Sequence, residues 1–187
     1  MSDQKIIPTH EIKPGFGRIF DTVKDPYKRR FHQVYLGIGS NIQPERNLKL
    51  SIHRLRDIAV VKRVSSVYET ESYGAPGPNF LNAAVLMITS SPIPILKSFL
   101  YQIEILHGRI RKENKNAPRT IDLDILLVDN RVVDTNIWSR AFAAVPLSEI
   151  YPNFIDPLTN KKLKEESSVL SKNTWIIRRK DLTLSSE

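Results

Sequence analysis

The sequence predicts an α+β fold with a ferredoxin-like β-α-β-β-α-β core, an antiparallel sheet with helices packed on one face. Two observations predict it. Apolar residues alternate along strand-like segments, and between these segments they recur at helical spacing. We expect this domain to occupy residues 33–187. Residues 1–32 show no sustained period and contain several prolines and glycines, so we expect an irregular N-terminal extension.

The first half of the predicted core is a strand, a helix and a second strand. QVYLGIG, residues 33–39, has the apolar character of a strand and runs into a turn-prone Ser-Asn pair. A helix is expected over about 44–59, because residues such as Leu48 and Ile52 form one apolar stripe. VVKRVSSVYET, residues 60–70, alternates as a second strand.

The second half repeats this order as strand, helix and strand. FLNAAVLMIT, residues 80–89, is expected to be a strand. Ser91 before Pro92 is a helix start signal, a capping hydroxyl followed by proline, and the helix is expected to end near Gly108. TIDLDILLV, residues 120–128, is the fourth strand. Shorter strand candidates are NRVV, FAAVPL and WIIRR.

Composition restricts the class of protein. A chain of 187 residues with 41% hydrophobic content is long enough for one sound core. It has no cysteine, which excludes disulfides, thiolate nucleophiles and cysteine-ligated metals. No apolar run approaches the roughly 20 residues that span a bilayer, and the first 30 residues lack the apolar core of a secretory signal. We therefore expect a cytoplasmic protein with no membrane partner.

The net charge of +8 is unevenly distributed. Most of the excess lies in residues 1–33 and 161–187, and the basic residues of the middle gather beside two aspartates. This arrangement favours a polyphosphate that arrives with a divalent metal over a nucleic acid, whose stacking platform would interleave aromatic and basic residues. We expect no nucleic-acid partner. The central basic residues are Arg109, Arg111, Lys112, Lys115 and Arg119.

Two aspartates lie in the strand predicted over 120–128. Asp122 and Asp124 are two residues apart, so they project from the same face and their charges repel each other. A solvated sheet face is the alternative explanation, but the apolar run ILLV follows directly. Mg²⁺ binds one or two protein carboxylates and fills its other sites with water and phosphate oxygens. We therefore expect two magnesium ions here, beside bound phosphate.

The phosphates need a binding element other than a Walker-type loop, because no G-x-x-x-x-G-K-[ST] sequence is present. Arg119 lies three residues before Asp122, and Arg109 and Arg111 follow the second helix. Guanidinium groups suit phosphate oxygens because they donate two parallel hydrogen bonds. The arginines are therefore expected to hold the phosphates.

Five motifs together resemble the hydroxymethyldihydropterin pyrophosphokinase family of folate biosynthesis, over about residues 33–178. The resemblance implies ATP-dependent transfer of pyrophosphate to the hydroxymethyl oxygen of the reduced pterin, with release of AMP. It also implies Mg²⁺ as cofactor and small-molecule substrates; the oligomeric state is left open. The motifs are GIGSN (37–41), SSVYET (65–70), FLNAAV (80–85), IEILHGRIRK (103–112) and the highly specific PRTIDLDILL (118–127).

The resemblance also implies roles for individual residues. Asp122 and Asp124 match the magnesium ligands. The residues that match the ATP site are Arg109, Arg111, Lys112, Arg119 and Arg140. The residues that match the pterin pocket are Thr70, Tyr73, Phe80, Asn82 and Phe142. The residues expected to be catalytic are Arg109, Arg119, Asp122 and Asp124.

One departure from the family pattern leaves two hypotheses. The family carries a Pro-His-Pro-like, nucleotide-contacting segment before the position of Arg140, and here no proline or histidine lies between Asp124 and Arg140. In the first hypothesis the protein is an active pyrophosphokinase, which the retained aspartates and arginines favour. In the second it is a divergent, non-catalytic relative that binds a pterin, a nucleotide or a protein partner. No residue is identified as the general base.

Overall fold

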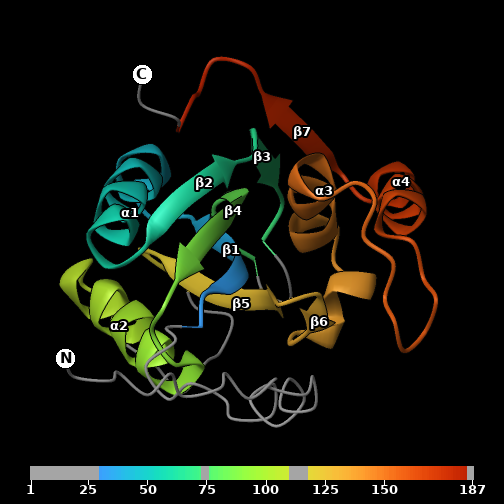
Figure 1. Ribbon diagram of the computed structural model, residues 1–187. Coiled ribbons are helices and arrows are strands. Elements are labelled where there is room, and N and C mark those ends of the chain that lie inside the picture. Colours follow the sequence, from blue (N-terminus) through green and yellow to red (C-terminus); the bar gives the residue numbers. More distant parts are fainter. Residues whose placement is uncertain (1–29, 73–75, 110–117, 185–187) are drawn as a thin grey trace, which may run out of the picture. The chain divides into compact units, whose positions relative to one another are not determined.

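The computed structural model describes residues 30–72, 76–109 and 118–184 (Figure 1). The helices and strands of these described residues lie in the unit formed by residues 31–187. In chain order these elements are β1 (His32–Ser40), α1 (Pro44–Ile58), β2 (Val60–Val64), β3 (Val67–Thr70), β4 (Phe80–Thr89), α2 (Ile93–Leu106), β5 (Asp122–Val128), β6 (Arg131–Val132), the 3₁₀ helix η2 (Thr135–Trp138), α3 (Ala141–Ile150), α4 (Leu163–Asn173) and β7 (Ile176–Arg179).

The strands form one antiparallel sheet, as predicted. In the described part of the chain it has seven strands in the order β6-β5-β1-β4-β3-β7, with β2 also paired to β4. The central strand β1 pairs with β4 on one side and with β5 on the other, both antiparallel. A bulge in β5 at Leu126 shifts the register, so that Tyr35 pairs with Leu127 and Leu36 with Ile125.

Helices cover both faces of the sheet, which corrects the expectation of a single covered face (Figure 1). Alternate residues of β1 divide the core: Leu36 packs in the cluster that includes Leu48 of α1 and Leu96 of α2. Tyr35 points to the other face and packs in the cluster that includes Leu147 of α3. The face under α3 is the one that carries the site described below.

The predicted strand over 60–70 is interrupted at Ser65 and Ser66, which separate β2 from β3. Ser65 pairs twice with Ala84: its N–H donates to the Ala84 carbonyl at 2.9 Å, and its hydroxyl accepts from the Ala84 N–H at 2.8 Å. The strand therefore bends here without losing its attachment to β4.

The α2 start signal and one short strand were predicted wrongly. Pro92 is the N-cap of α2, and no side chain caps the helix; the Ser91 N–H instead donates to Thr89 Oγ1 at 3.1 Å. FAAVPL lies in α3, with Pro146 inside the helix and the small, apolar Ala143 and Ala144 packed against the sheet. The segments NRVV and WIIRR contain β6 and β7, as expected.

Within the described ranges, no helix combines the length and apolar character that crossing a membrane requires.

Candidate active site

A cavity opens on the α3 face of the sheet, above β1, β4 and β5. Strand alternation explains its position, because Gly37 and Gly39 of β1 lie on this face and leave the floor free of side chains. The cavity gathers predicted site residues from four separate parts of the chain. Those that line it are Thr70, Phe80, Asn82, Arg119, Asp122, Asp124, Arg140 and Phe142.

The remaining predicted residues have different positions. Arg109 reaches the cavity wall through its ion pair with Asp122. Tyr73, Arg111 and Lys112 lie outside the described residues.

The two aspartates lie on one face of β5, as the alternation predicted. Asp122 and Asp124 line the cavity, whereas Leu123 and Ile125 are buried in the core cluster on the opposite face. The buried neighbours hold the strand in place, so the two carboxylates are fixed side by side.

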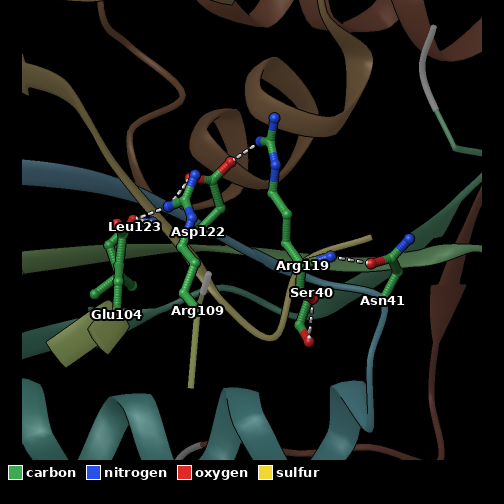
Figure 2. A network of polar contacts seen from close by, with 7 residues as sticks. All are labelled: Ser40, Asn41, Glu104, Arg109, Arg119, Asp122 and Leu123. Carbon is green, nitrogen blue, oxygen red and sulfur yellow. Dashed lines mark hydrogen bonds and ion pairs between the residues drawn. The ribbon is translucent and has the colours of Figure 1, made fainter. Parts of the chain in front are cut away.

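Asp122 is held by two arginines (Figure 2). Arg109 Nη1 donates to its Oδ1 at 2.7 Å, and Arg119 Nη1 donates to its Oδ2. The same Arg109 nitrogen also donates to Glu104 Oε1, and this Glu104 oxygen accepts the backbone N–H of Leu123 at 3.0 Å. Glu104 is only 4% exposed, so a buried carboxylate of α2 orients the arginine beside the aspartate pair.

The environment of Asp124 raises the pKa of its carboxyl group to about 6. Enclosure within the cavity is the largest cause, and the negative charges of Asp122, Asp134 and Glu104 add to it; Arg109 acts in the opposite direction. In the metal-free protein this environment therefore favours the protonated form of the Asp124 carboxyl group.

The donor set fits a hard divalent cation that brings other ligands with it. Two carboxylates on one strand face suit Mg²⁺, and a cation there would relieve the repulsion that raises the pKa of Asp124. Among the described residues, no group of three or more acidic or histidine side chains is placed to hold a metal. The remaining ligands would have to be water or substrate oxygens.

Across β1 from the aspartates, the cavity is lined by aromatic and amide side chains. Asn82 is 6% exposed, and its Nδ2 donates to Thr70 Oγ1 at 3.0 Å. Its Oδ1 lies over Gly39, where an added Cβ would come within 2.9 Å of it. Phe80 and Phe142 line the same cavity, and the Arg140 guanidinium lies 5.7 Å from the Phe142 ring centroid.

Several residues of the site were missed from the sequence. Glu104 had a signal, because it is a charged residue on the buried side of α2 beside Leu100 and Ile103. Asp134, which lines the cavity, had no signal. Asn41 lies in the GIGSN motif, but the motif does not indicate that its side chain holds the backbone of Arg119, since only the tertiary fold brings the two together.

Comparison with known protein families identifies the class of protein as a transferase. The model of the family 7,8-dihydro-6-hydroxymethylpterin-pyrophosphokinase matches residues 35–152, which is more than half of the chain. This chain therefore belongs to that family, as its motifs predicted.

Individual relatives agree with the family match. A 2-amino-4-hydroxy-6-hydroxymethyldihydropteridine pyrophosphokinase of Synechocystis sp. is 34% identical over 148 residues, which are 73% of this chain and 75% of that protein. The protein of the same name from Aquifex aeolicus is 37% identical over 144 residues, 71% of this chain and 88% of that protein.

The similarity extends to longer proteins. The folic acid synthesis protein FOL1 of Dictyostelium discoideum is 33% identical over 144 residues, but these are only 22% of its length. A crystal structure of wild-type Plasmodium falciparum HPPK-DHPS with pterin and p-hydroxybenzoate matches with a TM-score of 0.59 at 12% identity. The match covers 79% of this chain and 44% of that one, so this chain spans less than half of it and the likeness concerns the fold.

Proposed function

We propose that this chain transfers the β,γ-pyrophosphoryl group of ATP to the hydroxymethyl oxygen of a reduced hydroxymethylpterin, releasing AMP. Membership of a pyrophosphokinase family confirms the prediction of an enzyme and does not favour the non-catalytic alternative. The family also supports ATP as co-substrate. We also propose that the protein is cytoplasmic and that it binds two magnesium ions.

One observation carries the proposal: the acidic pair and the aromatic pocket open into the same cavity. Asp122 and Asp124 line it with Arg119 on the β5 side of β1, while Phe80 and Asn82 line it on the β4 side. A nucleotide held by the first group and a flat heteroaromatic ring held by the second would meet within one enclosed space. Transfer of this kind depends mainly on positioning and electrostatics, so such a meeting is its main requirement.

We assign the magnesium site to Asp122 and Asp124. Bound there, Mg²⁺ would supply positive charge to the phosphates of ATP. The arginines that now hold Asp122 would exchange that carboxylate for phosphate oxygens: Arg119 from the strand side and Arg109 from the end of α2. Arg140, at the N-cap of α3, lines the same cavity and would contact the phosphates from the opposite face.

The pterin is assigned to the β4 side of the cavity. A flat ring can stack on Phe80 and Phe142, whose faces exclude water from it. The bond from Asn82 Nδ2 to Thr70 holds the amide in place, and its Oδ1 can accept an N–H of the ring. Tyr73, Arg111 and Lys112 belong to this proposal through the family resemblance.

The deciding experiment measures AMP formed from ATP and hydroxymethyldihydropterin with Mg²⁺. Wild-type protein should form AMP only when the pterin is present, and Asp122→Ala should form none while keeping a wild-type circular dichroism spectrum. Folded wild-type protein that forms no AMP at millimolar ATP would instead favour the binding relative, for which the short segment between Asp124 and Arg140 is the motivating observation.

A further inference from the structure

Asn41, the residue after β1, lies between two loops that end in site residues. Its side chain is buried, with 6% of the residue exposed. One loop leads through Pro118 to Arg119 and β5, and the other leads through Pro78 to Phe80 and β4. Asn41 has a hydrogen bond to each of them.

The first contact holds the backbone of Arg119 (Figure 2). The Arg119 N–H donates to Asn41 Oδ1 at 2.7 Å, and the Arg119 carbonyl accepts the backbone N–H of Asn41 at 3.1 Å. Ser40 Oγ donates to the next carbonyl, that of Thr120, at 2.6 Å. Both backbone groups of Arg119 are therefore paired with the turn after β1, which fixes the point from which its guanidinium reaches Asp122.

The second contact holds the loop before β4. Asn41 Nδ2 donates to the carbonyl of Pro78 at 3.2 Å. The following residue is held as well, because Asn79 Nδ2 donates to Glu69 Oε1 at 2.9 Å. Phe80 and Asn82 follow within four residues, so the carbonyl bond of Asn41 sets where the aromatic end of the cavity begins.

We propose that Asn41 is a positioning residue that sets the two substrate subsites relative to each other. Its amide oxygen places Arg119 at the nucleotide end, and its amide nitrogen places the loop before Phe80 at the pterin end. This inference rests on the proposed function for the identity of the ligands, but the two hydrogen bonds of the Asn41 side chain are contacts within the chain itself.

Because an amide has a separate donor and acceptor, substitution can remove one of the two Asn41 hydrogen bonds and keep the other. Asn41→Asp keeps an oxygen that accepts the Arg119 N–H but removes the donor to Pro78, so a carbonyl then faces a carboxylate. Asn41→Ala removes both hydrogen bonds. Asn79→Ala is the matched control, because Asn79 is an exposed amide of the same loop whose side chain bonds Glu69.

The test combines steady-state kinetics for both substrates with hydrogen exchange at the Arg119 amide of the ligand-free chain. Asn41→Asp should raise the KM for the pterin roughly tenfold and change the KM for ATP less than twofold, with the Arg119 amide still protected. Asn41→Ala should raise both KM values, lower kcat by up to about a hundredfold and expose that amide. Asn79→Ala should match wild type in ATP kinetics and in protection.

Equal changes in both KM values for Asn41→Asp, or wild-type kinetics for Asn41→Ala, would overturn the proposal. If wild-type protein forms no AMP, the proposed function fails by itself. The inference is then tested by calorimetry with a non-hydrolysable ATP analogue and with the pterin. Asn41→Asp should bind the pterin more weakly and the ATP analogue as wild type does. Equal changes in the two affinities would refute the role of Asn41. If Asn41→Ala does not fold, the kinetics of Asn41→Asp and the hydrogen exchange of its Arg119 amide still test the proposal.

Discussion

Arg109 and Asp122 are joined by a 2.7 Å ion pair between Nη1 and Oδ1, although 13 residues separate them in the chain. The pair connects the end of α2 to the first residue of β5. Arg109 contacts Glu104 with the same nitrogen, so the arginine stands between a buried carboxylate and one that faces the cavity. The phosphates of the proposed substrate would therefore compete with the protein's own Asp122 for Arg109.

Glu104→Ala should destabilise the protein and misplace Arg109. The substitution removes the acceptor of the Leu123 N–H and the buried partner of Arg109, and breaking a buried pair of this kind costs about 3 kcal/mol of unfolding free energy. Urea denaturation measures the loss. Glu104→Gln, which keeps an oxygen for Leu123, should lose less; equal losses in the two variants would show that the charge of Glu104 contributes nothing.

The pKa of Asp124 gives the metal-free protein a pH dependence of known sign. Because the folded pKa, about 6, lies above the ordinary value of 3.8 for an aspartic acid side chain, the folded state binds the proton more tightly than the unfolded chain does. The contribution of this group to the unfolding free energy is therefore largest below pH 3.8 and declines as the pH rises to about 6.

Asp124→Asn should abolish this decline. In EDTA, the unfolding free energy of the variant relative to wild type should rise between about pH 4 and pH 6 and stay constant above that range. The variant should also lose magnesium-dependent turnover, because an amide is a weaker ligand than a carboxylate. Two stability curves that run parallel across this pH range would contradict the assigned pKa.

The fold was predictable where a local pattern matched the tertiary environment. The strand at 80–89 was found because it is apolar and buried on both faces, and the helix stripe of Leu48 and Ile52 was found because that face of α1 is buried in a core cluster. The helix α3 was missed because Phe142, Ala143 and Ala144 give an almost wholly apolar run that has no helical period, and Pro146 argues against a helix.

The site was predictable where it follows from strand geometry. Alternation alone placed Asp122 and Asp124 on one face, and the structure confirms this. The partners of Arg119 could not be predicted, because Asn41 lies 78 residues away and meets it only when β5 pairs with β1. The roles of Phe80 and Asn82 came from the family resemblance, since an apolar strand gives both residues an ordinary structural explanation.

Asn82→Ala should weaken pterin binding and leave ATP binding nearly unchanged. The variant loses the amide oxygen assigned to the ring and leaves the buried Thr70 hydroxyl without its donor, a loss of roughly 1–3 kcal/mol that corresponds to a tenfold to hundredfold higher KM for the pterin. The KM for ATP is the internal control. Similar increases for both substrates would contradict the assignment of Asn82 to the pterin end.

Gly39→Ala should reproduce much of this effect without touching the amide itself. A Cβ at position 39 would lie 2.9 Å from Asn82 Oδ1, so the amide would have to turn away from the position in which it faces the cavity. The KM for the pterin should rise about tenfold, consistent with the loss of one hydrogen bond. Gly37→Ala is the matched control on the same strand face, because its Cβ would meet only the Leu126 methyl groups at 3.4 Å, and a leucine side chain can shift. Kinetics in which the two alanine variants lose pterin affinity equally would show that the floor of the cavity, and not the Asn82 amide, sets the binding.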